Sequence, residues 1–531
     1  MHAGVCPVCR GVLNWLPSTA PDAETHHYAG GSEGLGAERT RKEFLKAVGG
    51  TWLALLGLAG CEPDPRVGAA ASLARPGRTW AFRSRPDLSP PLVEVTTPAR
   101  GTAPGYVFVA PKNGPDEGYP AQDGPMILDD EGRPVWFRPV AREAEDAMDF
   151  RAQSYRGEPV LTWWEGSHAG FGDGEYVIFD ASYGEVARFR AGNGYKGDHH
   201  EFLITPQDTA LILIYHEVPT DLSAFGGPKA GSVMDGIVQE IEIETGRVLF
   251  EWHSLEHVGI EESYYEPNPE QQEAYDYFHI NSADAYDEGH LLISARRTSA
   301  AYKVDRKTGE VAWRLGGKRS DFEMGPGTEM AYQHDVRHHP EGVFTIFDNR
   351  GAAMNEQSRG LVLEVDEGAM TADLVHEYTL PDEPFGIFQG NVQVLPNGNA
   401  FVGWGSAPYF AEFTREGGLL YEVRFPHEVE SYRAYRFPWK GRPEDAPAVA
   451  VEPGQDGRTT LYASWNGATE VASWEVLAGP DPEGLEPVGH VPRKGFETAI
   501  FLTTDEPYVA ARAKDRSGQR LGTTEAVKRG G

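Results

Sequence analysis

The chain has 531 residues, which is more than one ordinary domain needs and favours two folded units. Its formal net charge is −32 and its body contains no stretch rich in lysine or arginine, so nucleic acid is not an expected partner. The 62 glycines, 39 prolines and abundant aromatic residues, with almost no long apolar stretch at helical spacing, indicate many short strands joined by turns. The expected fold class is all-β.

The N-terminal region carries the features of an exported protein. Basic residues at 39–46 precede an apolar run at 47–60, which has the length of a signal peptide rather than of a membrane-spanning helix. Leu58–Cys61 resembles a bacterial lipobox, which predicts acylation of the Cys61 sulfur and a lipid anchor on the extracytoplasmic face of the membrane. The basic segment also resembles a twin-arginine signal, except that Lys42 replaces the second arginine, so the export route stays open.

The flanks of the predicted signal peptide at 39–61 show no periodicity. Residues 1–38 are interpreted as a disordered leader or an over-extended start, and residues 62–85 as a flexible tether. The three cysteines, Cys6, Cys9 and Cys61, all precede the folded body, so no disulfide is expected there. Cys6 and Cys9 have half of a zinc-ligand spacing without a second half, and no metal is predicted.

An internal repeat determines the predicted architecture. A hairpin with glycine or acidic residues at its turn recurs six times, at residues 126–136, 176–186, 238–250, 302–313, 362–368 and 410–421. Repeats of this length are typical of propeller blades, so six copies predict a six-bladed β-propeller over residues 86–445.

A second hairpin lies between these repeats but occurs only five times, at residues 150–165, 200–215, 279–296, 334–348 and 390–404. The missing inner strand can come from residues 431–439, returning after the sixth blade to pair with residues 106–110 of the first. Such closure removes an exposed sheet edge. Residues 452–528 then read as a small β-sandwich that resembles a fibronectin type III module, and no chemistry is assigned to it.

The inner strands place three histidines in one register. Alignment of these strands by their turns brings His200, His279 and His334 to the same position in three consecutive blades, with Asp149 and Gly390 in the flanking blades. Because inner strands surround the propeller axis, these histidines should face one central funnel. Because side chains alternate between the two faces of a strand, Asn281 should lie on the same face as His279, and Arg296 can reach the same end of the funnel. A single histidine at the end of a strand usually has a structural role. Three in the same register indicate function more strongly, because closing the ring of blades does not require imidazole side chains.

Several segments resemble the arylsulfotransferase family over nearly all of residues 86–440. They are Pro90–Val95, Pro104–Pro111, Gly124–Asp129, His199–Phe202, His279–Ser282, Ile293–Thr298, Trp313–Gly317, Gln333–Asp335 and Leu395–Trp404. The resemblance implies a six-bladed propeller that moves a sulfuryl group from an aryl sulfate to a phenol, with no nucleotide-activated donor and no cofactor. An aryl sulfate and a phenol are therefore the expected small-molecule partners.

The resemblance also implies a role for each residue of the site. His334 matches the histidine that carries the sulfuryl group, and His200, His279, Asn281 and Arg296 match residues that bind and polarise it. Arg297 stands where the family has a histidine and is assigned with Asn281 to substrate binding. The paired cysteines of some periplasmic members are absent. The sequence makes no prediction of oligomeric state.

Two other function classes compete with this interpretation. A metal-dependent propeller enzyme would use the histidines as ligands, but Gly390 stands where a fourth ligand would lie, and Arg296 repels a cation while attracting a sulfate. A non-enzymatic exported scaffold is the other class, because Tyr302–Trp313 also resembles repeats of quinone-binding and assembly propellers. A scaffold has no reason to gather three imidazoles and a guanidinium at one end of its axis.

Overall fold

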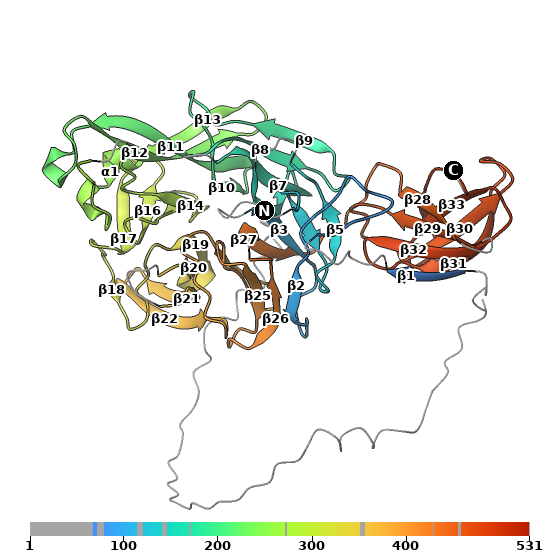
Figure 1. Cartoon of the computed structure of the whole chain (residues 1–531). Helices are drawn as coiled ribbons and strands as arrows, with labels where there is room; N and C mark the ends of the chain where they lie inside the picture. Colours follow the sequence, from blue (N-terminus) through green and yellow to red (C-terminus); the bar gives the residue numbers. More distant parts are fainter. Residues whose placement is uncertain are drawn as a thin grey trace, which may run out of the picture.

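The computed structural model describes residues 67–71 and 79–529, apart from 114–119, 141–145, 169–170, 271–272, 351–355, 428 and 455–457 (Figure 1). The predicted leader, signal peptide and Cys61 lie outside this part of the chain. The described residues include no helix long and apolar enough to cross a membrane. Nearly all regular elements are strands. The helical elements within the described ranges are the short α1 (Ser254–His257), η3 (Ser223–Phe225), η4 (Ile260–Glu262) and η5 (Pro340–Gly342).

Six antiparallel sheets surround a common axis and form the predicted propeller. The order within each blade is from the axis outward. Blade 2 has β6 (Asp146–Tyr155), β7 (Glu158–Ser167), β8 (Asp173–Phe179) and β9 (Glu185–Phe189); blade 3 has β10 (Asp198–Ile204), β11 (Thr209–Thr220), β12 (Gly231–Glu242) and β13 (Arg247–His253); blade 4 has β14 (Ile280–Ala285), β15 (His290–Ala295), β16 (Ala300–Asp305) and β17 (Val311–Gly316).

The last two complete blades each gain a fifth strand at their outer edge. Blade 5 has β19 (His334–His339), β20 (Val343–Asp348), β21 (Arg359–Asp366) and β22 (Thr371–Tyr378), with β18 (Glu323–Met324) parallel to β22. Blade 6 has β23 (Asn391–Val394), β24 (Ala400–Gly403), β25 (Tyr409–Phe413) and β26 (Leu419–Arg424), with β2 (Glu94–Thr97) on β26. The six predicted repeats are the outer hairpins of the six blades.

Blade 1 closes the ring. Its inner strand is β27 (Val429–Phe437), which pairs with β3 (Tyr106–Asn113), and β4 (Met126–Leu128) and β5 (Pro134–Phe137) follow outward. The pairing joins Phe437 to Tyr106 at one end and Val429 to Asn113 at the other. The predicted closure by a strand from beyond the sixth blade is confirmed.

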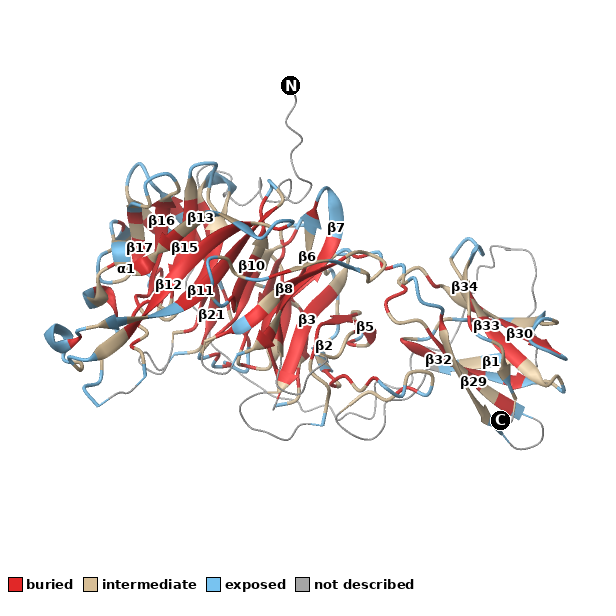
Figure 2. Ribbon diagram, turned by 90° about the horizontal axis from the view of Figure 1, so that it is seen from above, coloured by how far each residue is buried: buried red, intermediate tan, exposed pale blue. Residues whose placement is uncertain are grey.

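Burial on both faces explains the apolar runs of the middle strands. Each blade packs between two neighbours, so side chains on both faces of a strand are removed from contact with solvent. An example is the fully buried run from Ala210 to Ile214 of β11. Figure 2 shows buried residues continuing along most strands of the propeller. This burial stabilises the ring by the hydrophobic effect and fixes the inner strands around the axis.

The second unit is a two-layer sandwich. One sheet has the order β1 (Val67–Ala71), β32 (Glu497–Thr503), β29 (Arg458–Ser464) and β28 (Ala448–Pro453). The other has β31 (Glu486–Pro492), β30 (Ser473–Gly479), β33 (Tyr508–Lys514) and β34 (Arg520–Thr523), with β35 (Val527–Lys528) also on β33. The flexible tether predicted over residues 62–85 is wrong for residues 67–71, because Val67 and Ala69 pack against the sandwich core and β1 fills the edge of β32. It is also wrong for residues 79–85, where Phe82 is buried in the propeller core and Ser84 bonds to Glu497.

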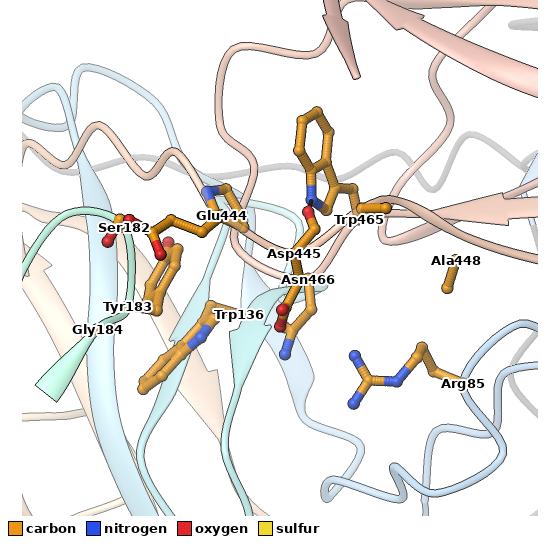
Figure 3. Close-up of a pocket in the computed structure, with 12 residues that line it drawn as sticks. Arg85, Trp136, Ser182, Tyr183, Gly184, Glu444, Asp445, Ala448, Trp465 and Asn466 are labelled. Atoms are coloured by element: carbon orange, nitrogen blue, oxygen red, sulfur yellow. Dashed lines mark hydrogen bonds between the residues drawn. The ribbon is translucent and has the colours of Figure 1, made fainter. Parts of the chain in front are cut away.

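The sandwich attaches to the outside of blade 1. The Asn466 side chain accepts a hydrogen bond from Phe137 N–H (3.0 Å) and donates one to Phe137 O (2.9 Å), while Gly467 N–H donates to Val135 O (2.8 Å). A pocket of about 250 Å³ lies at this junction, with Trp136, Tyr183 and Trp465 among its lining residues (Figure 3). The junction lies at the outer strand β5, away from the inner strands that carry the histidines.

Candidate active site

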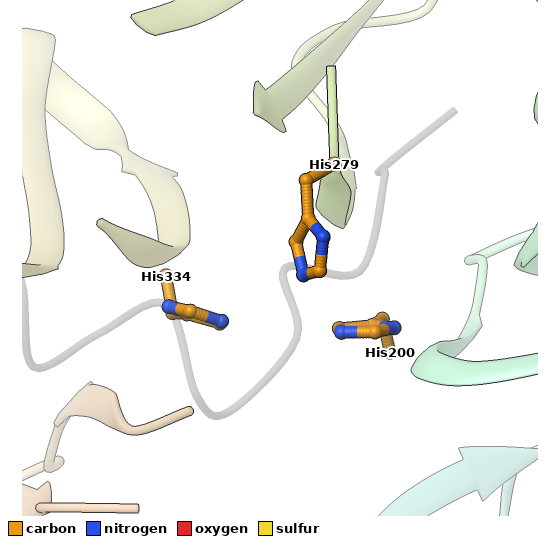
Figure 4. Close-up of side chains that lie close together, drawn as sticks. All are labelled: His200, His279 and His334. Carbon is orange, nitrogen blue, oxygen red and sulfur yellow. The ribbon is translucent and has the colours of Figure 1, made fainter. Parts of the chain in front are cut away.

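The structure brings His200, His279 and His334 together. One ring nitrogen of each lies within 4.8 Å of the others, and Figure 4 shows the three rings pointing toward one another. His200 lies on β10, His334 begins β19, and His279 immediately precedes β14, so the three come from the innermost strands of consecutive blades. His200 and His334 are buried, and His279 is half-buried.

Irregular pairing of the inner strands shapes this cluster. The register shifts after Met148, Asp198, Ile280, His334 and Ser431, which places a bulge on the innermost strand of five blades. His279, Asp335 and Asp149 also have left-handed φ angles of 53°, 55° and 56°. A bulge redirects side chains that simple alternation would place elsewhere. The site therefore depends on local departures from regular strand geometry.

The tautomer of His334 follows from its neighbours. Asn349 donates through its amide nitrogen to Gly386 O (2.7 Å) and Gln389 O (2.9 Å), so its Oδ1 is an acceptor facing His334 Nδ1 at 2.7 Å. Nδ1 must therefore carry the proton. The backbone N–H of Gln389 donates to Nε2 at 3.2 Å. His334 is thus held neutral, with a lone pair on Nε2.

The other two histidines each have an aspartate partner. Nδ1 of His200 bonds to Asp198, and Nδ1 of His279 bonds to Asp276. Burial raises the pKa of both carboxyls, but the neighbouring histidines, and Arg297 in the case of Asp276, lower both below the usual value. The aspartates are therefore ionised and accept from Nδ1–H, which leaves Nε2 of each imidazole as the nitrogen that can exchange a proton.

Burial and the charge of Arg296 both lower the pKa of His334 and His279. The pKa of His334 lies well below its usual range, although the hydrogen bond that His334 donates to Asn349 acts in the opposite direction. Burial likewise lowers the pKa of His279, with Asp276 opposing the change. His334 is consequently an unprotonated, potentially nucleophilic imidazole at neutral pH.

The two arginines after β15 flank the histidines. Arg296 N–H donates to His279 O at 2.8 Å, and its guanidinium donates to Ile387 O at 3.0 Å and lies over the Tyr332 ring. Burial lowers the pKa of Arg296 to about 10, and Arg297 adds to this effect, so Arg296 stays charged at neutral pH. Arg297 lies 3.8 Å from Asp276 and 4.0 Å from the centre of the Tyr265 ring. The pair supplies positive charge at the mouth of the histidine cluster.

Asn281 is close to the cluster but has a structural bond. Its amide donates to Gln333 O at 2.7 Å, tying β14 to the residue before His334. Its Oδ1 is buried without a hydrogen-bond partner among the described residues. The side chain is fully buried and fixes the spacing of two inner strands.

A network of six charged side chains fills the axis beside the site. Arg433 of β27 lies 2.9 Å from Asp149, 3.2 Å from Glu201 and 3.2 Å from Asp335. Arg151 and Arg337 supply the other two positive charges, and all six side chains are buried or nearly so. The predicted register placed Asp149 with the histidines, whereas the structure places it in this network.

The closing strand also contacts the backbone of the site. Tyr432 OH donates to His200 O (3.1 Å), Arg433 donates to Asn281 O (3.1 Å), and Gly390 N–H donates to Tyr432 O (3.1 Å). Tyr432 and Arg433 form the bulge of β27 between Ser431 and Ala434. Ring closure therefore positions the strands that carry the catalytic candidates.

Sequence reasoning missed the residues that orient the imidazoles. Asp198 and Asp276 lie only two and three residues before their histidines, so an acidic residue shortly before each inner-strand histidine is a signal that could have identified them. Asn349, Gln389 and Tyr432 gave no such signal. Asn349 follows β20, the strand paired with β19, and the other two come from more distant parts of the chain.

The three histidines have the donor atoms of a metal site, since aspartate or amide groups hold Nδ1 and leave Nε2 free in two of them. One feature favours an anion instead. Arg296 brings a positive charge close enough to lower the pKa of His334 and His279. The arrangement suits a group with negatively charged oxygens more than a cation.

Fold and site together define a six-bladed propeller with a cationic, histidine-lined site at its axis. The model of the family described as Arylsulfotransferase (ASST) matches residues 151–426, which is more than half of the chain and includes all three histidines. The chain belongs to the arylsulfotransferase family. No curated protein matches the sequence.

Solved structures match this chain at low identity and with low TM-scores. A protein of unknown function from Bacteroides caccae is 12% identical, with 62% of this chain and 98% of that chain covered and a TM-score of 0.38. Streptogramin B lyase is 9% identical, with 70% and 94% covered and a TM-score of 0.33. The Cps50 (Swd1) β-propeller domain of Myceliophteria thermophila is 11% identical, with 68% and 100% covered and a TM-score of 0.31.

Proposed function

We propose that this protein transfers a sulfuryl group from an aryl sulfate to a phenol through a covalent intermediate on His334. The observation that carries the proposal is the convergence of three imidazoles beside the half-buried guanidinium of Arg296, with a lone pair on His334 Nε2. Membership of the arylsulfotransferase family supports the activity. Sulfuryl transfer needs cationic or hydrogen-bonding groups around the sulfur and an uncharged nucleophile in line with the leaving group.

In the first half-reaction His334 Nε2 attacks the donor sulfur. The sulfur–oxygen ester bond breaks, and its electron pair leaves with the phenolate. The charge that develops on the ring is shared with Asn349 Oδ1, which accepts from Nδ1–H. Arg296 stabilises the sulfuryl oxygens and Arg297 helps to bind them, while Asn281 supports the site through its bond to Gln333 O. Gln389 N–H, which gives up its bond to Nε2 at this point, is placed to donate to one of these oxygens.

The two His–Asp pairs move the proton. In the second half-reaction His200 or His279 accepts the proton of the acceptor phenol, whose oxygen attacks the sulfur while the nitrogen–sulfur bond breaks. The partner aspartate stabilises the imidazolium that forms. The phenolate released in the first half-reaction takes a proton from solvent, and the imidazolium formed in the second releases its proton to solvent, so no proton is gained or lost overall.

Turnover of a chromogenic aryl sulfate, with and without a simple phenol, tests this function. We expect a burst of one phenol per active site without acceptor and steady turnover with ping-pong kinetics when the phenol is added. Equal steady turnover in both conditions would identify a hydrolase, and no turnover in either would favour a scaffold. Activity that is lost on treatment with a chelator and restored by one metal ion per chain would instead support a metal-dependent enzyme built on the same three histidines.

The dependence of the burst on pH tests the environment of His334. Because burial and Arg296 both lower the pKa of His334, the burst rate should stay level through neutral pH and decline only well below pH 6.5. In Arg296→Met the lost charge raises that pKa, so the decline should begin at a higher pH. Stopped-flow measurement of phenol release between about pH 4 and 8 checks the shift. A decline at the same pH in both proteins would contradict the electrostatic coupling.

We further propose that the protein is exported and held on the extracytoplasmic face of the membrane by acylated Cys61. Its lipobox-like segment supports this proposal. Cys61→Ser should move the protein from the membrane fraction to the soluble extracytoplasmic fraction. The mass of the N-terminal peptide of the wild type should show the added lipid. Retention of a processed Cys61→Ser protein on membranes would contradict the anchor.

A further inference from the structure

Exposed apolar side chains are concentrated on two loops next to the site. Among the described residues, eight large hydrophobic side chains are exposed, and four of them are Tyr264 (48%), Tyr265 (47%), Phe385 (39%) and Ile387 (43%). The others, Val186, Phe225, Leu249 and Phe501, lie on separate elements. Exposed apolar groups that gather at one place mark a binding surface, whereas scattered ones need no explanation.

The first loop is joined to Arg297 and to an aspartate of the site. Tyr264 N–H donates to Arg297 O at 2.8 Å, and the Arg297 guanidinium lies 4.0 Å from the centre of the Tyr265 ring. Asp276, which bonds to His279, ends the same loop. Tyr264 and Tyr265 therefore flank the cationic mouth on one side.

The second loop is joined to Arg296 and to His334. Ile387 O accepts a hydrogen bond from Arg296 at 3.0 Å, and Gly386 O accepts one from Asn349 at 2.7 Å. Two residues after Ile387, the backbone N–H of Gln389 donates a hydrogen bond to His334 Nε2. Ile387 through its own backbone, and Phe385 through the adjacent Gly386, are thus attached to the groups that surround the nucleophile, on the side of Arg296.

We propose that these two loops form an aryl clamp, made of Tyr264 and Tyr265 on one side and Phe385 and Ile387 on the other. The clamp binds the ring of the donor and, in turn, the ring of the acceptor, while the arginine pair binds the sulfuryl group. This proposal rests on the proposed function and deepens it by naming the residues that select the substrate. The occupant is a flat aromatic anion, because aromatic faces and guanidinium groups both interact favourably with an aromatic ring.

The clamp has a kinetic consequence. Both half-reactions use His334, so the departing ring and the arriving ring must occupy the same place in turn. A phenol that binds to the free enzyme therefore excludes the aryl sulfate. We expect inhibition by high acceptor concentrations that is competitive with the donor, and aromatic sulfates should be preferred over alkyl sulfates of equal charge.

Binding of naphthalene-2-sulfonate, an aryl anion without an ester bond to transfer, tests the clamp separately from catalysis. Calorimetry should show that Tyr265→Ala and Phe385→Ala each raise its Kd by about fivefold or more, and the double variant by more than either. Tyr265→Phe, which keeps the ring, should bind within about twofold of the wild type. Phe501→Ala removes an equally exposed ring from the sandwich and is the matched control, with no expected effect.

The possible outcomes separate the two proposals. If the double variant binds the sulfonate and turns over aryl sulfate as the wild type does, the clamp is wrong and the proposed function stands. If the wild type binds the sulfonate with the expected sensitivity but turns over no aryl sulfate, the clamp stands as an aryl-anion site and the proposed function fails. Hexane-1-sulfonate binding that matches naphthalene-2-sulfonate in both affinity and response to the variants would overturn the aromatic preference.

Discussion

Replacement of His334 by alanine is expected to abolish the phenol burst and to lower turnover by about 10⁴-fold or more, the order seen when a covalent nucleophile is removed. No other side chain in the cluster is fixed in the same way. Asn349 holds the proton of His334 on Nδ1, and burial with the charge of Arg296 keeps the ring neutral. Rapid-quench measurement of phenol release without acceptor detects the burst directly.

His338→Ala provides the matched control for this variant. His338 lies on the same strand, four residues beyond His334, and stacks on Tyr286 instead of facing the axis. It should keep the burst. The sulfo-enzyme of the wild type should also be detectable by mass, with the modification on the peptide that contains His334. A His334→Ala protein with burst and turnover within a few-fold of the wild type would show that another group attacks, even if the reaction is the proposed one.

Replacement of Arg433 by methionine is expected to lower the free energy of unfolding by about 3–5 kcal/mol, the usual cost of removing one partner of a buried ion pair. Arg433 is fully buried among Asp149, Glu201 and Asp335, and the variant leaves three carboxylates facing only Arg151 and Arg337. Urea unfolding followed by tryptophan fluorescence measures the loss. The loss should shrink in acid, because protonation neutralises the surplus carboxylate.

An exposed ion pair serves as the control for Arg433. Lys440 lies 2.8 Å from Glu470 and its side chain is 64% exposed, so Lys440→Met should change the stability by about 1 kcal/mol at most. Because Arg433 also donates to Asn281 O and its neighbour Tyr432 donates to His200 O, residual folded Arg433→Met should transfer more slowly than the wild type. Unchanged stability and activity would contradict both the ion network and its link to the site.

The repeat and the register could be predicted from the sequence. Six hairpins with similar turns indicated six blades, and a missing inner strand indicated closure by residues 431–439, which is the pairing of β27 with β3. The same alignment placed His200, His279 and His334 at equivalent positions, and the structure brings them within 4.8 Å. Strand pairing and a ring of similar blades convert equal sequence positions into neighbouring positions in space, so periodicity was sufficient for this much.

The sequence by itself determined the all-β class, the six blades, their closure and the histidines that meet at the axis, because each follows from a local repeat. The tertiary structure alone decided how those histidines act. Asn349 and Gln389 reach His334, Tyr432 reaches His200, and Asp149 joins Arg433 instead of the histidines. It also placed β1 in the sandwich. These contacts join residues far apart in the chain through bulges that break strand alternation, and alternation was the rule on which the sequence prediction depended.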